Sequence, residues 1–211
     1  DDTPAFMVSI IVTTGIGFVF KHLGRNSENK LSRRDSFLLV TLVWVVFSLF
    51  ATLPFLFGGY LTTFTDAYFE AMSGFTTTGA TIIDDVEALP HGILFWRSLT
   101  QWVGGLGIVF TTVALLPSVV KGSTKVFAAE ATGPIKTKLH PRLSTSVRWI
   151  WGVYLTITIS CMICYKIFGM NYFEALNYAM SSAATGGFAV NNTSTEFFHS
   201  PALEYTTIFF C

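Results

Sequence analysis

Long apolar stretches alternate with short polar connections along the whole chain. Four of these stretches, residues 5–20, 37–57, 93–117 and 147–168, are apolar over about the 20 residues that a helix needs to cross a bilayer, the first being slightly short. A fifth begins near residue 202 and continues to residue 211. The pattern therefore predicts an all-α integral membrane protein.

The composition supports the same class. Hydrophobic residues make up 51% of the 211 residues and charged residues only 12%, about half of the usual share. A soluble domain of this size could not cover its surface with so few charges. Three cysteines are too few for a disulfide-stabilised fold, and the equal numbers of basic and acidic residues, 13 of each, give no basic surface for nucleic acid.

The basic residues indicate the orientation in the membrane. Residues 21–36 hold five Lys and Arg, and residues 118–146 together with Arg148 hold six. Both connections are therefore predicted to be cytoplasmic, because cytoplasmic loops carry the excess of positive charge. The two remaining cations, Arg97 and Lys166, lie near outer ends of spans, where we expect them to extend to the lipid headgroups. An ion pair of Arg97 with the acidic residues 84–87 is the alternative.

The outer connection after residue 57 is too long for a tight hairpin and too apolar for a solvated loop. Asp66 is the predicted N-cap of a helix from residue 67 to about 75, and Glu70 is expected in its first turn, where the helix dipole favours an acid. At about 1.5 Å per residue, such a helix crosses only half of the hydrocarbon core. Residues 76–81 would return as extended chain, which survives at that depth only where it lines a wet cavity or is buried in protein.

The same unit occurs a second time along the chain. Tyr-Phe-Glu-Ala of residues 68–71 recurs 104 residues later, Ala-Met-Ser of residues 71–73 recurs 108 residues later, and the pair Thr78-Gly79 recurs as Thr185-Gly186. The second copy is therefore predicted to carry four extra residues, about one helical turn, and then to lose one, since the offset of the Thr-Gly pair is 107. Repetition of span, half-helix, return segment and span predicts two copies of one membrane unit.

This repeat sets the expected domain organisation. A leading transmembrane helix occupies residues 1–20 and a cytoplasmic basic loop residues 21–36. The first span–pore–span repeat is expected to cover residues 37–117, a cytoplasmic loop residues 118–146, and a second repeat, truncated in its last helix, residues 147–211.

The return segments carry the chemistry expected of a filter for monovalent cations. A half-helix that enters from outside points its partly negative C-terminus toward the membrane centre. The extended chain after it exposes carbonyl oxygens that can replace the water around a cation. Gly79 and Gly186 permit backbone dihedrals closed to other residues. Neither segment carries a charged side chain, so a divalent-selective ring of carboxylates is not supported.

Four ordered motifs carry a family resemblance. They are Ser-Gly-Phe-Thr-Thr-Thr-Gly-Ala-Thr at residues 73–81, Trp-Val-Gly-Gly-Leu-Gly at 102–107, Glu-x-x-Gly-Pro at 130–134 and Ala-Thr-Gly-Gly-Phe at 184–188. With these motifs the chain resembles the Trk/Ktr/HKT superfamily of potassium transporters, and most closely its TrkH branch. The resemblance implies four span–pore–span units arranged pseudo-fourfold around one pore, of which this chain would contain about half.

The resemblance also implies the ion-binding residues, which are the filter carbonyls of Thr77, Thr78, Gly79, Ala184, Thr185 and Gly186. Ala183 and Ala184 lack the hydroxyls of the first copy, and no Gly-Tyr-Gly follows, so a filter less stringent than that of tetrameric potassium channels is expected. Potassium is the substrate, and no cofactor or other metal is implied.

The resemblance further implies a homodimer in the bacterial inner membrane. Membrane lipids and a cytoplasmic nucleotide-binding regulator, TrkA, would be its partners. The basic loop of residues 118–146 would dock this regulator or simply contact anionic lipids. The pore loops would face the outside.

The predicted function is potassium uptake, passive or coupled to protons or sodium. A KtrB-like or sodium-permeable relative is the nearest alternative, and a non-conducting scaffold subunit is an alternative of another class. An intramembrane enzyme is disfavoured, because Ser73 has neither the flanking glycine of a nucleophile elbow nor a histidine base. Cys161 and Cys164 are expected to serve in packing, and His91 and His199 to lie at the membrane interface, none of them as metal ligands.

Overall fold

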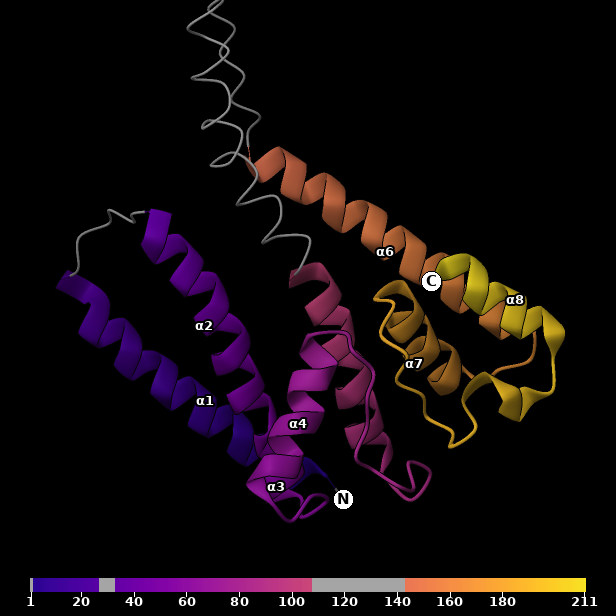
Figure 1. Ribbon diagram of the computed structural model, residues 1–211, viewed down its shortest axis with the longest axis horizontal. Helices are drawn as coiled ribbons and strands as arrows, with labels where there is room; N and C mark the ends of the chain where they lie inside the picture. The colour runs from indigo at the N-terminus through magenta and orange to yellow at the C-terminus, as the bar shows by residue number, and fades with distance from the viewer. Residues whose placement is uncertain (1, 27–32, 108–142) are drawn as a thin grey trace, which may run out of the picture.

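The computed structural model describes residues 2–26, 33–107 and 143–211, and every regular element in these ranges is a helix (Figure 1). Residues 91–107 form a helix, which we call the central helix. The other elements are α1 (Thr3–Leu23), η1 (Gly24–Asn26), α2 (Arg33–Ala51), α3 (Leu53–Phe57), α4 (Phe64–Phe75), α6 (Leu143–Ile167), α7 (Tyr172–Ala183), η2 (Ser194–Phe198) and α8 (Pro201–Phe210).

Two of these helices are long and apolar enough to cross a membrane, Thr3–Leu23 and Trp149–Ile167, and Thr41–Phe57 forms a shorter apolar segment. They fall on three of the predicted spans. The fourth, residues 93–117, is helical as far as residue 107, and its remainder lies outside the described residues, as does most of the predicted loop 118–146.

The predicted span 37–57 is locally distorted at Thr52. α2 ends at Ala51 and α3 begins at Leu53, with Pro54 in its first turn. Proline has no N–H to donate to the preceding turn, so the distortion follows from the sequence. The Thr52 hydroxyl donates to the Leu49 carbonyl (2.7 Å). Thr52 itself keeps helical dihedrals (φ −69°, ψ −25°) and its carbonyl accepts from the Leu56 amide (3.1 Å), so the apolar helix Thr41–Phe57 continues past this local distortion.

The two half-helices are present, and each has 12 residues, so each rises about 18 Å. The α4 helix begins earlier than predicted, because the N-cap is Thr63, whose hydroxyl accepts from the Asp66 amide (3.1 Å). In α7, Asn171 and Glu174 form a reciprocal capping box. The predicted N-cap Asp66 therefore lies at the third helical position, as Glu174 does.

The repeat has a constant offset of 108 residues, because α4 and α7 have equal lengths and their N-caps are Thr63 and Asn171. The predicted four-residue insertion in the second half-helix is therefore wrong. The likeness between residues 68–71 and 172–175 is displaced by one helical turn. In the correct alignment the counterpart of Glu70 is Tyr178.

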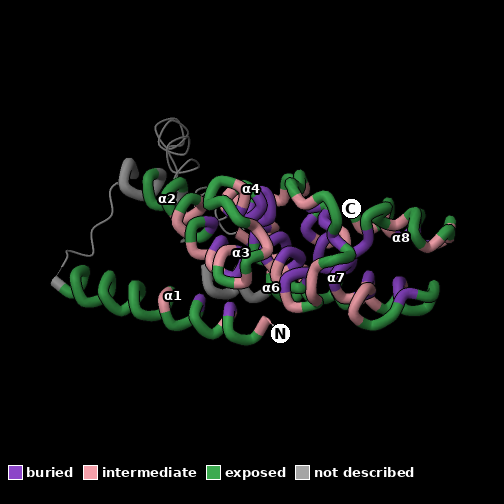
Figure 2. Tube along the Cα trace, turned by 90° about the horizontal axis from the view of Figure 1, so that it is seen from below, coloured by how far each residue is buried: buried purple, intermediate pink, exposed green. Residues whose placement is uncertain are grey.

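The central helix packs between the two half-helices (Figure 1). Gly74 of α4 has no room for a side chain beside Thr100, and Gln101 bonds to α7 on the other side. Buried residues gather around this centre, whereas α1 is exposed along most of its length (Figure 2). Exposed apolar helices around a polar-containing centre are the expected arrangement in lipid.

Candidate cation filter

The return segments that follow α4 and α7 have the same unusual backbone. Thr77 and Thr185 both have φ of 53°, and Gly79 and Gly187 have φ of 77° and 85°. Positive φ is uncommon for residues other than glycine, and here it recurs at an offset of 108. The positive φ values fall at alternate residues, 77 and 79 in one segment and 185 and 187 in the other, so the two segments share one backbone shape.

Hydrogen bonds fix each segment to the end of its half-helix. In the first repeat the amides of Thr77 and Thr78 donate to Gly74 and Ser73 (3.0 Å each), and in the second the amides of Thr185 and Gly186 donate to Ser182 and Ser181 (2.9 Å each). Within the described part of the chain no group donates to the carbonyls of Thr77, Thr78, Gly79, Thr185, Gly186 or Gly187. In both segments, the amides of the first two residues donate to the preceding helix, whereas these carbonyls accept no hydrogen bond within the described residues.

These hydrogen bonds correct the predicted register of the second segment. Thr185, Gly186 and Gly187 correspond to Thr77, Thr78 and Gly79, so Ala184 corresponds to Thr76. The sequence comparison paired Gly79 with Gly186 because it matched the pair Thr-Gly, whereas the backbone pairs Gly79 with Gly187, the second glycine of the Gly-Gly pair. Ion binding by Ala184, Thr185 and Gly186 stays a prediction.

The two segments meet directly. A Cβ at Gly79 would overlap the carbonyl oxygen of Gly186 and lie 3.5 Å from the Cα of Gly187. The two return segments, which are offset by 108 residues in the sequence, therefore lie in direct contact.

Gln101 of the central helix forms hydrogen bonds on both sides of the second return segment. Gln101 is fully buried, and its Oε1 accepts hydrogen bonds from the Ser181 hydroxyl (2.8 Å) and the Phe188 amide (3.1 Å). Its amide group also fills the space that a side chain at Gly186 would need. A residue of the first repeat thus holds the return segment of the second.

Arg97 lies one turn before Gln101 on the central helix and forms a buried ion pair with Glu70. Its Nε donates to Glu70 Oε1 at 2.8 Å, and both side chains are buried, at 2% and 0% exposure. The predicted extension of Arg97 to the lipid headgroups is therefore wrong, as is its pairing with residues 84–87. Sequence reasoning also misplaced Glu70, which lies in the middle of α4 and not in its first turn. Lys166 is exposed, and its Nζ donates to the Met170 carbonyl (3.2 Å) near the end of α6.

The acidic loop of residues 84–87 forms hydrogen bonds with the second repeat and not with Arg97. The Asn192 side chain accepts from the Val86 amide (2.8 Å) and donates to Asp85 (2.9 Å), and its backbone amide donates to Glu87 (3.0 Å). These bonds tie the loop after the first return segment to the loop after the second.

The glycines of the Trp-Val-Gly-Gly-Leu-Gly motif permit close packing. Gly104 lies against the carbonyl of Phe75 so closely that no Cβ fits, and Gly105 lies where a Cβ would be 3.1 Å from the Cα of Ala184. Gly107 lies against Trp44, where a Cβ would be 3.0 Å from the indole. The motif therefore holds the ends of both half-helices at a fixed distance.

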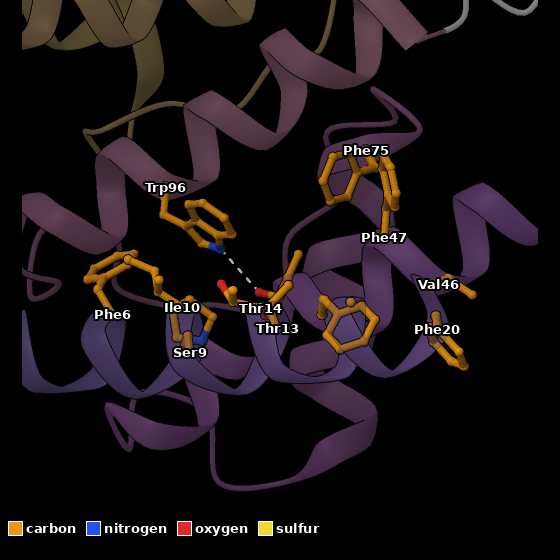
Figure 3. A pocket seen from close by; sticks show the side chains of 14 residues that line it. Phe6, Ser9, Ile10, Thr13, Thr14, Phe20, Val46, Phe47, Phe75 and Trp96 are labelled. Atoms are coloured by element: carbon orange, nitrogen blue, oxygen red, sulfur yellow. Dashed lines mark hydrogen bonds between the residues drawn. The ribbon is translucent and has the colours of Figure 1, made fainter. Parts of the chain in front are cut away.

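An apolar cavity of about 500 Å³ opens between α1 and α2 (Figure 3). Phe6 and Trp96 lie together on one side of it and Phe47 and Phe75 on the other, with the Trp96 indole donating to the Ala51 carbonyl (3.1 Å). No charged residue lines it. The cavity is therefore mainly apolar, with the Ser9, Thr13 and Thr14 side chains as its polar lining, and none of residues 76–79 or 184–188 lines it.

The described residues contain no cluster of His, Cys, Asp and Glu that could hold a metal ion. Cys161 is a buried free thiol, and His91 packs edge-on against Phe173. The Ser73 hydroxyl is buried without a partner in the described part of the chain. Among the described residues, no histidine or carboxylate forms a hydrogen bond with this hydroxyl.

Comparisons with known proteins agree with this architecture. Residues 2–211 match the TrkH family model, described as a cation transport protein. The Trk system potassium uptake protein TrkH of Halomonas elongata is 40% identical over 202 residues, which are 95% of this chain and 42% of that protein. The Trk system potassium uptake protein TrkG of Escherichia coli K12 is 36% identical over 201 residues, 94% of this chain and 41% of that protein.

A solved structure has the same fold. The crystal structure of the potassium transporter TrkH from Vibrio parahaemolyticus superimposes with a TM-score of 0.84 at 33% identity, over 99% of this chain and 42% of that one. The predicted all-α membrane class is thereby confirmed. The chain spans about two fifths of the length of the relatives that it matches.

Proposed function

This chain belongs to the TrkH family of cation transport proteins, and from that premise we propose that it contributes part of a potassium-uptake pore in the bacterial inner membrane. The observation that carries the proposal is the pair of return segments with free carbonyls at matched positions. The relatives are named as potassium uptake proteins of the Trk system, which favours potassium as the substrate.

The proposed mechanism is exchange of water for backbone carbonyls. A cation that reaches the segments loses its hydration shell to the carbonyls of Thr77, Thr78 and Gly79 and those of Thr185, Gly186 and Gly187. The C-termini of α4 and α7 lead directly into these segments, so the negative ends of both helix dipoles favour a positive charge there. Neither return segment, residues 76–81 or 184–188, contains an Asp or Glu, which suits a monovalent ion that must also leave.

Two segments do not surround an ion, and a groove beside α4 suggests how the ring is completed. This groove, of about 340 Å³, is lined by Phe69, Ser73, Thr78 and Ala80, among others. The corresponding face of α7 is covered by the central helix, whose Gln101 binds Ser181. Ser73 is the counterpart of Ser181, and its buried hydroxyl has no partner in the described part of the chain. We infer that two further units complete a pseudo-fourfold pore and that a helix of one of these units covers this groove.

The partners of the chain follow the same premise. The relatives function in a named multi-component Trk system, so we propose that this protein too acts with further subunits. Docking of a TrkA-like regulator on residues 118–146, and a homodimer, stay predictions, since that loop lies almost wholly outside the described residues.

Competition for rubidium uptake tests the proposal. The intact protein is reconstituted into liposomes, and uptake of rubidium-86 is measured against increasing external potassium or sodium. We expect potassium to inhibit uptake at a concentration at least about tenfold lower than sodium, because carbonyl ligands at fixed spacing discriminate ions by size and by the cost of dehydration.

Each other outcome favours a different function. Equal inhibition by the two ions would indicate the sodium-permeable alternative. Absence of uptake above empty liposomes, with the protein correctly inserted, would indicate the non-conducting scaffold. The paired positive φ of Thr77 and Thr185 favours conduction, because strained backbone of this kind gathers at functional sites.

A further inference from the structure

We propose that Arg97, oriented by Glu70, is a positioning residue that fixes the spacing between the two neighbouring filter segments and so sets the discrimination between potassium and sodium. This inference rests on the proposed function, because it assigns a role in a filter. It concerns a side chain that never reaches the carbonyl-lined site itself.

On the side of the first repeat, the pair binds the chain that follows the filter. Arg97 Nη2 donates to the Thr81 hydroxyl (3.1 Å), and that hydroxyl donates in turn to the Glu70 carboxylate (3.0 Å). Glu70 Oε2 also accepts from the Ile82 amide (3.1 Å). Gly79 lies only two residues before Thr81, so this closed set of bonds fixes where the first segment leaves the filter.

On the side of the second repeat, the same guanidinium binds the other segment. Arg97 Nη1 donates to the carbonyl of Ala189 (3.2 Å), and the guanidinium carbon lies 4.3 Å from the centre of the Phe188 ring. Gly187 is the residue immediately before Phe188. One buried side chain thus contacts both segments just beyond the positions where their free carbonyls lie.

Only arginine can make this set of contacts. Its planar guanidinium offers donors in three directions at once and stacks on an aromatic face, whereas a lysine ammonium is a compact point charge. A charge buried in a membrane protein is costly, and the cost is offset here by Glu70 and by the hydrogen bonds on both sides. The second repeat has no acidic residue at the position of Glu70, because the counterpart of Glu70 is Tyr178. The pair therefore acts at one junction among the described residues.

The test measures ion selectivity in the intact protein, not activity alone. The ratio of sodium to potassium concentrations that halve rubidium uptake is compared for wild type, Arg97→Lys and the double variant Glu70→Gln/Arg97→Gln. The double variant removes both charges together, so no unpaired buried charge remains to unfold the protein. We expect the ratio to fall at least about tenfold in the double variant, because charge-assisted bonds to both segments are lost. Arg97→Lys, which retains only the pairing with Glu70, should give an intermediate ratio.

Ser98→Ala is the matched control. Ser98 is buried next to Arg97, but its hydroxyl donates only to the Leu94 carbonyl of the same helix (3.3 Å), so the ratio should stay at the wild-type value. A wild-type ratio in the double variant would overturn the proposal, and if that variant fails to insert, a wild-type ratio in Arg97→Lys would do so. The proposed function would still stand if Gly79→Ala abolished uptake. Wild-type uptake in Gly79→Ala would instead refute the proposed filter.

Discussion

Replacement of Gly79 by alanine should abolish rubidium uptake while leaving the protein in the membrane. The residue has φ of 77°, which costs an L-residue roughly 1–2 kcal/mol. A methyl group there would also overlap the carbonyl oxygen of Gly186, one of the proposed ligands. The two neighbouring segments would have to move apart, and the ring of oxygens would no longer fit a dehydrated ion. Tracer uptake in liposomes measures the effect directly.

Gly59→Ala is the control that distinguishes the effect of backbone strain from the effect of a methyl group in the proposed filter. Gly59 has a similar φ of 69° but has no heavy atom within 4 Å of its Cβ position, and it lies in the turn after α3. The same backbone strain is thus introduced outside the site, and uptake should remain near the wild-type rate. If Gly79→Ala conducted as well as Gly59→Ala, the return segments would not line the pore.

The second large effect is expected at Gly104, where alanine should lower the stability of the protein. A methyl group at this position would overlap the carbonyl of Phe75, the last residue of α4. Overpacking of this kind costs about 1–3 kcal/mol, more than the roughly 1 kcal/mol that alanine contributes over glycine inside a helix. Because Thr76 follows Phe75 directly, the displaced helix end should also impair uptake. The midpoint of thermal unfolding in detergent, followed by tryptophan fluorescence, gives the change in stability.

Gly152→Ala provides the comparison within α6. Gly152 lies in the interior of that helix with no heavy atom within 4 Å of its Cβ position. Alanine should therefore leave the midpoint unchanged or raise it slightly, since only the helix propensity changes. A Gly104→Ala protein as stable as Gly152→Ala would show that the central helix does not contact α4 as closely as described.

The membrane class, the half-helices and their repetition could be predicted from the sequence, because each leaves a local signature. Span length follows from apolar runs, and a half-helix followed by Thr76 and Gly79 is visible as an apolar segment too short to cross. The register between repeats could not be obtained in this way. Identical residues at 68–71 and 172–175 occupy different turns of their helices, and only the N-caps Thr63 and Asn171 and the backbone dihedrals fix the offset of 108.

The buried side chains behind the filter were the least predictable. Arg97 near the end of a span has the sequence signature of an interfacial cation. Its actual burial depends on Glu70, 27 residues earlier, and on Ala189, 92 residues later. Gln101 likewise binds Ser181 across 80 residues. Such contacts depend on how the two repeats face each other, which a single sequence does not encode locally.

Crystallographic location of rubidium in the intact protein tests the central claim most directly. Crystals grown in a rubidium salt and measured at the rubidium absorption edge reveal the ion by its anomalous scattering. The account predicts a peak within direct coordination distance of the carbonyls of Thr77 and Thr78 and of Thr185 and Gly186. Strong rubidium peaks elsewhere in the membrane region, with none between the two return segments, would contradict it.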